Sequence, residues 1–239
     1  MAGEESFIDT TQHTGQDTER SRVWQRWGAK HLDYRLFQKS GVLGKGGEEW
    51  RNVAEHTLVV NATAHWIAQG LRSAGHPVRI DLIDAASMLQ DVTKRREKEQ
   101  GVGQADRLES TIHQDALRAA GYSEKVIEYA LYSGRVPEMF LADSDEQRKT
   151  VENLPLEKLV GAYADARVRN VEIVSLEDAR DKNKLKIPKD AAVYDQWYSF
   201  YKLVEERLFS LIGRPPTDLT NESVFELVRA ENDASSASE

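Results

Sequence analysis

Three side chains of kinds that commonly bind metals lie on separate apolar stretches of the chain. His56 follows the residues NVAE, Asp91 follows MLQ, and Asp165 lies within AYADARVR. Imidazole nitrogens and carboxylate oxygens are ordinary ligands of divalent cations, so the three groups form a site if their helices converge. A buried carboxylate must be paired or coordinate a metal, because burying it alone is very costly. The sequence therefore offers a candidate metal centre.

Both aspartates also have explanations that involve no metal. Asp91 precedes a block of positive charge, KRREK, and residues three and four apart on a helix can form ion pairs. Asp165 has arginines two and four residues further along, so charge pairing competes with metal coordination there too. The cations in question are Lys94 and Arg95 beside Asp91, and Arg167 and Arg169 beside Asp165.

His113 is a further candidate ligand. It stands four residues after Glu109, so the imidazole and the carboxylate lie one helical turn apart and could share either a metal or a proton. His65 stands nine residues after His56. At about 100° per residue it falls on the opposite face of the same predicted helix. His65 therefore cannot join His56 at one metal.

Composition narrows the class of protein. A formal net charge of -8 over 239 residues discourages binding to nucleic acid or to an anionic membrane. The absence of cysteine excludes disulfides, zinc-thiolate sites and thiol nucleophiles. No apolar run approaches the roughly 18 residues of a membrane span. The first residues lack the basic-then-apolar order of a signal peptide, so we expect a cytoplasmic protein.

Apolar residues recur at helical spacing along most of the chain. The pattern predicts an all-α fold of eight to ten helices in a single domain over residues 18–230. Residues 1–17 and 231–239 are polar and have the composition of disordered segments. The predicted helices cover residues 18–37, 48–74, 81 to beyond 91, 105–120, 123–132, 155–172, 191–212 and 222–230.

The predicted helix over residues 191–212 has an aromatic face. Such a face belongs either to the core or to the seam of a homodimer, and the sequence leaves both open. The apolar residues of this face are Val193, Trp197, Phe200, Tyr201, Val204, Leu208 and Leu211.

Taken together, NVAEHTLVV, MLQDVTKRRE and LVGAYADARVRNVEIVSLEDAR resemble the HD-domain superfamily of metal-dependent phosphohydrolases. That family is all-α and binds a divalent metal through a histidine, an adjacent His-Asp pair and a distant aspartate. The resemblance covers residues 48–182 and places these ligands at His56, Asp91 and Asp165. It places the family's frequent lysine at Lys94. It implies that the three ligands converge.

The chain departs from the family pattern at Gln90, which replaces the histidine of the pair. An amide oxygen is a weak, hard ligand, suited to magnesium or calcium, and it can also hold a metal-bound water. Members with two metals add further histidines. His113 lies where one is expected, but the next is absent near residues 132–134. The resemblance therefore implies a mononuclear site for manganese, magnesium, cobalt, nickel, iron or zinc.

Two functions follow from the resemblance. The first is hydrolysis of a nucleotide or another small phosphate ester, in which the metal activates water and Asp91, Lys94 and Arg95 form the catalytic group. Lys94 and Arg95 would hold phosphate oxygens. The second is an inactive HD scaffold that binds a phosphorylated ligand or a protein partner, and the substitution at Gln90 is what favours it.

Overall fold

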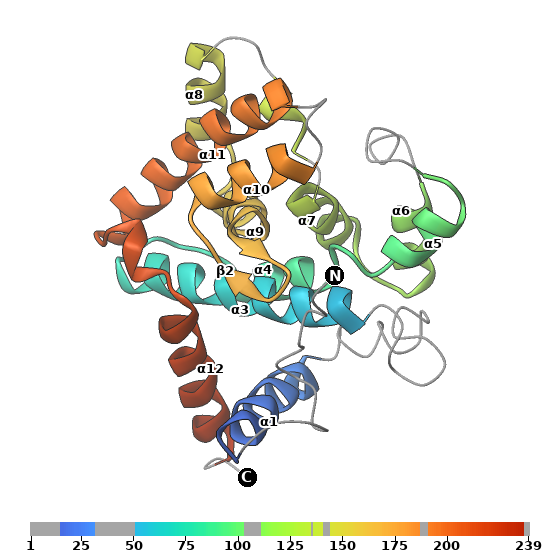
Figure 1. Cartoon of the computed structure of the whole chain (residues 1–239), viewed down its shortest axis with the longest axis vertical. Coiled ribbons are helices and arrows are strands. Elements are labelled where there is room, and N and C mark those ends of the chain that lie inside the picture. Colours follow the sequence, from blue (N-terminus) through green and yellow to red (C-terminus); the bar gives the residue numbers. More distant parts are fainter. Residues whose placement is uncertain are drawn as a thin grey trace.

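A computed structural model of the chain describes residues 15–31, 51–102, 111–134, 136–140, 144–186 and 191–236. This part is almost entirely helical, which confirms the all-α class (Figure 1). The glycine cluster after residue 40 and most of the segment before the first helix lie outside these ranges. The elements are α1 (Gly15–Lys30), α3 (Arg51–Ser73), α4 (Ile80–Leu89), α5 (Lys94–Glu99), α6 (Ile112–Ala119), α7 (Glu124–Gly134), η2 (Pro137–Phe140), α8 (Ser144–Asn153), α9 (Leu156–Arg167), β1 (Val168–Arg169), β2 (Glu172–Ile173), α10 (Leu176–Lys186), α11 (Ala191–Ile212), η4 (Pro216–Asp218) and α12 (Asn221–Ser236).

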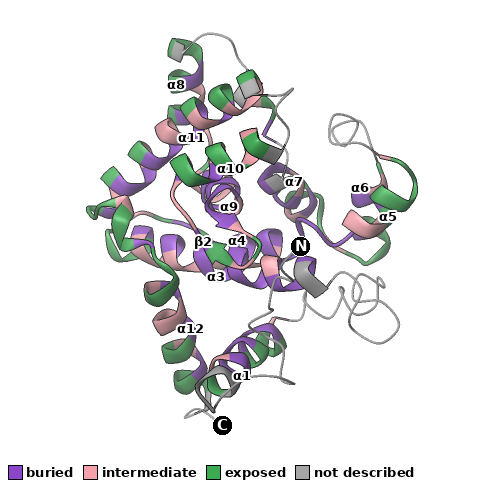
Figure 2. Ribbon diagram, viewed as in Figure 1, coloured by how far each residue is buried: buried purple, intermediate pink, exposed green. Residues whose placement is uncertain are grey.

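Helix α9 occupies the middle of the molecule. It packs against α3, α4, α7, α10 and α11, and Figure 1 shows it surrounded by these helices. Its residues from Leu159 to Ala164 are all buried, as are Ala166 and Arg167 (Figure 2). A helix that is apolar on every side is stable only when other elements enclose it. Asp165, the partly exposed residue in this run, therefore lies where the enclosure opens.

The core divides into two clusters of buried side chains. The larger one joins α3, α9 and α11 with α1 and α12, and the smaller one joins the start of α3 with α4, α6 and α7. The aromatic face of α11 belongs to the larger cluster, because Phe200, Val204 and Leu208 are fully buried there. This face is therefore core within one chain.

Asp91 lies in a turn rather than inside a helix. Helix α4 ends at Leu89, and α5 begins at Lys94. The intervening backbone makes turn hydrogen bonds from Val92 N to Leu89 O and from Lys94 N to Asp91 O. The turn keeps Gln90 and Asp91 buried while the charged residues that follow reach the surface.

The helix that was predicted over residues 155–172 ends at Arg167. A two-stranded antiparallel hairpin follows, in which Val168 pairs with Ile173 and Arg169 with Glu172. β-Branched residues favour strands over helices. Asn170 adopts the left-handed conformation, with φ 53°, which asparagine tolerates better than most residues. Asn170 is therefore well suited to its position in the hairpin turn.

The end of the chain is more ordered than its composition predicts. Helix α11 has the predicted bounds, and Ser175 caps α10 as expected, with its Oγ accepting from Asp178 N at 3.0 Å. Helix α12, however, continues to Ser236 instead of ending near residue 230. The Asn232 amide donates to Val23 O at 2.8 Å and thereby fixes α12 to α1.

Helices α7 and α9 cross at Gly161. A Cβ atom added there would lie 2.4 Å from Ser133 Oγ and 3.5 Å from Ser133 Cβ. We expect Gly161→Ala to lower the free energy of unfolding by about 1–3 kcal/mol, because the hydroxyl is displaced from its bond to Tyr129 O. Urea denaturation followed by circular dichroism measures this change.

The double variant Gly161→Ala/Ser133→Ala is the matched control. It removes the clashing oxygen and leaves an ordinary carbon contact at 3.5 Å. We expect it to regain most of the lost stability, because alanine is also a better helix former than glycine by about 1 kcal/mol. Equal destabilisation in the single and double variants would contradict this account of the crossing.

Candidate functional site

His56 projects from α3 with an orientation that its backbone contact determines. Its Nδ1 lies 2.9 Å from the carbonyl oxygen of Asn170, at the turn of the hairpin. A carbonyl can only accept a hydrogen bond, so Nδ1 carries a proton and donates it. In the neutral imidazole the other ring nitrogen, Nε2, is then unprotonated. This is the tautomer in which a histidine presents Nε2 to a metal.

The Nε2 atom of His56 faces Asp165. Its distance to Asp165 Oδ1 is 3.1 Å, and the two side chains are 14% and 31% exposed. An unprotonated nitrogen and a carboxylate oxygen are both acceptors, so this contact is favourable only with a proton or a cation between them. The pair is therefore a two-ligand cation site or an imidazolium-carboxylate ion pair.

Gln90 completes the contact from the end of α4. Its Nε2 donates to Asp165 Oδ1 at 3.1 Å. Its Oε1 is shielded from solvent and has no hydrogen-bond partner among the residues that the structure describes. Buried polar atoms without partners are rare and call for an explanation such as a water or an ion. His56, Gln90 and Asp165, from three separate segments, thus converge on one point.

Asp91 and the two cations after it have local partners. The Asp91 carboxylate is buried and accepts from Lys94 Nζ at 2.6 Å, which is the ion pair considered as the alternative to metal coordination. Arg95 pairs with Glu99 at 2.7 Å. The side chain of Lys94 is 41% exposed, so it is accessible from solvent.

His113 is buried on α6, a helix that packs against α7. Within the described ranges, no group of three or more histidine, aspartate and glutamate side chains is arranged to hold a metal. Neither Asp91 nor His113 therefore joins His56 and Asp165 as a third ligand in this conformation. The side chain that does contact Asp165 beside His56 is that of Gln90, through its amide nitrogen.

Asp165 interacts electrostatically with Arg169 and Tyr201. Burial lowers the pKa of Arg169, and the negative charge of Asp165 partly opposes this effect. Burial also raises the pKa of the Tyr201 hydroxyl, and the charge of Asp165 adds to the increase. Arg167, by contrast, pairs with Glu205 at 3.4 Å. Of the two neighbouring arginines, Arg169 interacts with the charge of Asp165, and Arg167 forms its ion pair elsewhere.

Two features of the site escaped sequence reasoning. The first is that the carbonyl of Asn170 fixes the tautomer of His56. The second is that Tyr201, on α11, interacts with the charge of Asp165. An asparagine after an apolar helix is a turn signal, and it was the available clue to the first feature. Tyr201 carries no local signal, because its role depends on how α11 packs against α9.

A second histidine-aspartate pair on α3 and α4 provides a contrast. His65 Nδ1 lies 2.9 Å from Asp84 Oδ1, and His65 Nε2 lies 3.0 Å from the amide nitrogen of Gln69. Nδ1 therefore donates to the carboxylate while Nε2 accepts from the amide. Every polar atom of this pair is satisfied by a neutral imidazole, unlike the pair formed by His56.

The sequence matches no protein-family model, and comparisons with curated proteins and with solved structures found no similar chain. Across the described part of the chain, no helix has both the length and the apolar character needed to cross a membrane.

We expect Asp165→Asn to raise the free energy of unfolding of the metal-free protein by about 1 kcal/mol at pH 8.5, where imidazole is ordinarily neutral. Both His56 Nε2 and Gln90 contact Asp165 Oδ1, and an amide NH2 in the place of that oxygen has two hydrogens. It can donate one to His56 Nε2 and the other to Gln90 Oε1 once the Gln90 amide turns over, so that no two acceptors face each other. Urea denaturation in the presence of a chelator measures the change.

Asp84→Asn is the matched control for this experiment. Asp84 accepts a charge-assisted hydrogen bond from His65, so losing its charge should lower stability by about 1 kcal/mol. Opposite signs for the two variants support the assignment of acceptors. A loss of stability in both would show that the His56 pair is an ordinary ion pair even at this pH.

Proposed function

We propose that this chain is a metal-dependent phosphohydrolase of the HD type. Its substrate is a nucleotide or another small phosphate ester, and its metal site is mononuclear. The observation that carries the proposal is the contact between His56 Nε2 and Asp165 Oδ1, in which a histidine fixed as a Nδ1 donor faces a carboxylate.

The distance within this pair suits a metal. Two ligands that each lie about 2.1 Å from a cation, at right angles, are about 3.0 Å apart. The separation of His56 Nε2 and Asp165 Oδ1 is 3.1 Å. The two atoms therefore need little movement to bind one ion. The side chain of Asp165 is 31% exposed, which leaves the ion a route from solvent.

Gln90 would supply a third ligand by turning over its amide. The Gln90 nitrogen donates to Asp165, and among the described residues its oxygen has no partner. Rotation of the amide plane would direct the oxygen toward the same point, at the cost of the hydrogen bond to Asp165. An amide oxygen favours hard cations, so magnesium and manganese suit this site better than zinc.

Asp91 would join the site only by releasing Lys94. The two form an ion pair at 2.6 Å with the carboxylate buried, so the lysine neutralises a charge that would otherwise be costly. A divalent ion near Asp91 would take over that role. The freed ammonium group of Lys94, which is partly exposed, would then be available to a phosphate from solvent.

The bound metal would activate water and neutralise charge on the phosphate group. The protein's own contribution is to hold His56 through Asn170, to place Gln90 against Asp165, and to offer the cations of Lys94 and Arg95. An arginine can bind two phosphate oxygens at once, which also orients the ester.

The alternative function is that of a binding module which has kept the scaffold without turnover. A specific observation favours it: Asp91 is occupied by Lys94, and the described residues contain no group of three ionisable metal ligands. Such a module would still bind a phosphorylated ligand through Lys94 and Arg95. The two functions differ in whether a metal binds and whether the ester is cleaved.

Metal analysis separates these alternatives. The protein is purified without chelator, and its metal content is measured by mass spectrometry beside that of Asp165→Asn. We expect about one ion per chain in the wild type and loss in the variant, and manganese-dependent release of phosphate from nucleotides. Metal without hydrolysis would support the binding module, whereas no metal after incubation with manganese, magnesium and cobalt would refute the metal site.

We expect Gln90→His to tighten binding of manganese or cobalt by about tenfold or more, because imidazole is the stronger ligand for these ions. Isothermal titration calorimetry measures the affinity. Gln90→Leu is the matched control and should weaken binding, since it removes the amide oxygen but keeps the apolar bulk. Equal affinities in the two variants would place Gln90 outside the coordination sphere.

A further inference from the structure

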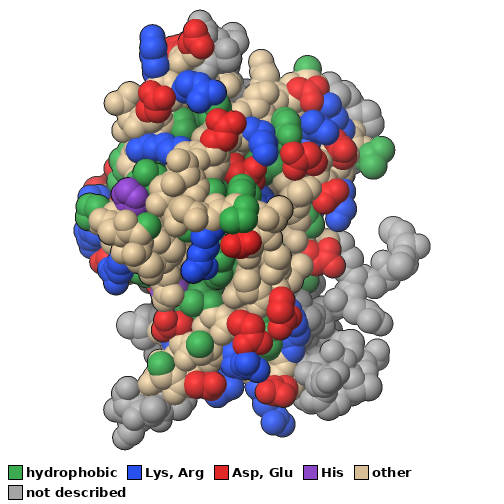
Figure 3. Space-filling model, turned by 90° about the vertical axis from the view of Figure 1, so that its left-hand side faces the viewer, with side chains coloured by type: hydrophobic (Ala, Val, Ile, Leu, Met, Phe, Trp, Pro, Cys, Tyr) green, Lys and Arg blue, Asp and Glu red, His purple; other side chains and the backbone are tan. Residues whose placement is uncertain are grey.

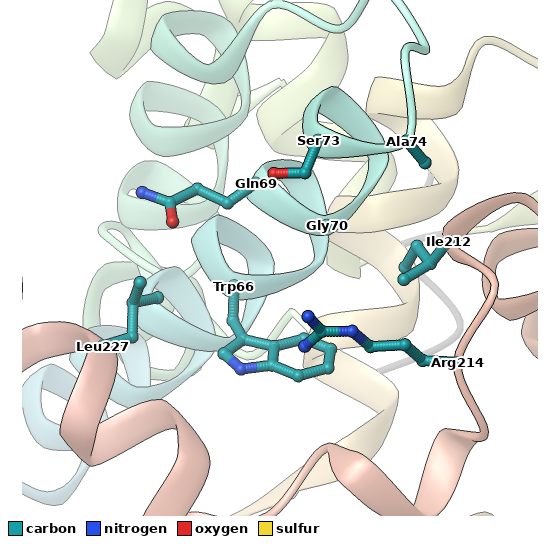
Figure 4. A pocket seen from close by; sticks show the side chains of 8 residues that line it. All are labelled: Trp66, Gln69, Gly70, Ser73, Ala74, Ile212, Arg214 and Leu227. Carbon is teal, nitrogen blue, oxygen red and sulfur yellow. The ribbon is translucent and has the colours of Figure 1, made fainter.

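A cavity of about 400 Å³ lies at the opposite end of α3 from His56 (Figure 4). It opens between the last turns of α3, the end of α11 and the side of α12. Its volume is within the range of small-molecule sites. The apolar part of its wall comes from Trp66, Gly70, Ala74, Ile212 and Leu227, and the polar part from Gln69, Ser73 and Arg214.

The apolar part of the cavity wall suits a ligand whose hydrophobic part is flat. Trp66 is half-buried and packs on Phe209 with ring centroids 6.4 Å apart, which fixes the indole at one side of the cavity. Gly70 brings α3 close to α11, because an added Cβ would lie 3.1 Å from Ile212 Cγ2. The glycine leaves backbone as the floor of the cavity, where a larger side chain would intrude.

The polar side chains of the cavity wall differ in how many hydrogen-bond partners they have within the protein. The Gln69 amide nitrogen has two partners, since it donates to His65 Nε2 at 3.0 Å and to Glu231 at 2.7 Å. Arg214 is exposed, and within the described ranges its guanidinium has no hydrogen-bond or ion-pair partner. Figure 4 shows it extending across the cavity toward Trp66.

The surface around the cavity is neither predominantly acidic nor predominantly basic. Figure 3 shows acidic and basic side chains interspersed over the face that bears the ends of α3 and α11. Attraction of an anion to the cavity therefore depends on Arg214 itself. A guanidinium binds a carboxylate or phosphate in a defined planar geometry, so Arg214 would also determine the orientation of the bound anion.

We infer that this cavity is a binding site for a small flat molecule that carries one anionic group. The apolar body lies against Trp66, and the anion pairs with Arg214. The site is independent of the proposed metal centre, because Trp66 stands ten residues after His56 on α3, a separation of about 15 Å along the helix axis. It does not require the chain to be a phosphohydrolase.

The probe is 2-naphthoate, a flat carboxylate, compared with 2-naphthamide, which has the same shape without the charge. Binding is followed by the indole N–H signals of the tryptophans in nitrogen-15 spectra of the full chain, with the Trp66 signal assigned from Trp66→Phe. We expect 2-naphthoate to shift the Trp66 signal saturably, with a Kd of about 1 mM or tighter. The amide should bind about tenfold more weakly.

Arg214→Gln tests the source of this preference. The variant should bind the acid and the amide with equal affinity. Arg72→Gln is the matched control, because Arg72 is also exposed near the end of α3 but does not line the cavity. It should keep the tenfold preference of the wild type.

Three results would overturn the inference. They are equal affinity of the wild type for acid and amide, an unchanged preference in Arg214→Gln, and no shift of the Trp66 signal at several millimolar probe. Each concerns the cavity alone, so failure here leaves the metal proposal untouched.

Discussion

The candidate site depends on the hydrogen bonds that the buried guanidinium of Arg167 makes to the surrounding segments. A buried cation is tolerated only when its donors are satisfied. Arg167 meets the Tyr163 hydroxyl and Glu205 through Nη1, Leu219 O through Nη2 and Val174 O through Nε. These partners come from α9, from α11 and from the segments before α12 and after β2. One side chain therefore holds together the elements that surround Asp165.

The position of His56 follows from that arrangement. With Val174 held by Arg167, the hairpin turn lies over α3 and the Asn170 carbonyl receives the Nδ1 proton of His56. Nε2 is then directed at Asp165, two residues before Arg167 on the same helix. The pair of His65 and Asp84 is held differently, because Gln69 contacts His65 Nε2 and is itself bound to Glu231 of α12.

The parts of this structure that could be predicted from sequence are those in which one local pattern dominates. Helix α11 has its predicted bounds because its apolar stripe is long and Gly213 ends it with a positive φ of 73°. The hairpin after α9 was missed, because it depends on contacts between Arg167 and distant segments. The turn that contains Asp91 was missed for a similar reason. Its burial is offset by Lys94, and spacing alone could not decide between that pair and a metal.

Under the proposed function, the departure from the motif at Gln90 is compatible with a metal site. A neutral histidine at that position could offer either a donor or an acceptor to Asp165, and changing between them would require a proton to move. An amide carries both functions at once and exchanges them by rotation. The Gln90 nitrogen donates to Asp165, while its oxygen is buried without a partner among the described residues. If the proposal holds, the same amide, turned over, would offer its oxygen to a hard cation. Such a site would bind soft metals more weakly, because an amide oxygen is a poorer ligand for them than an imidazole.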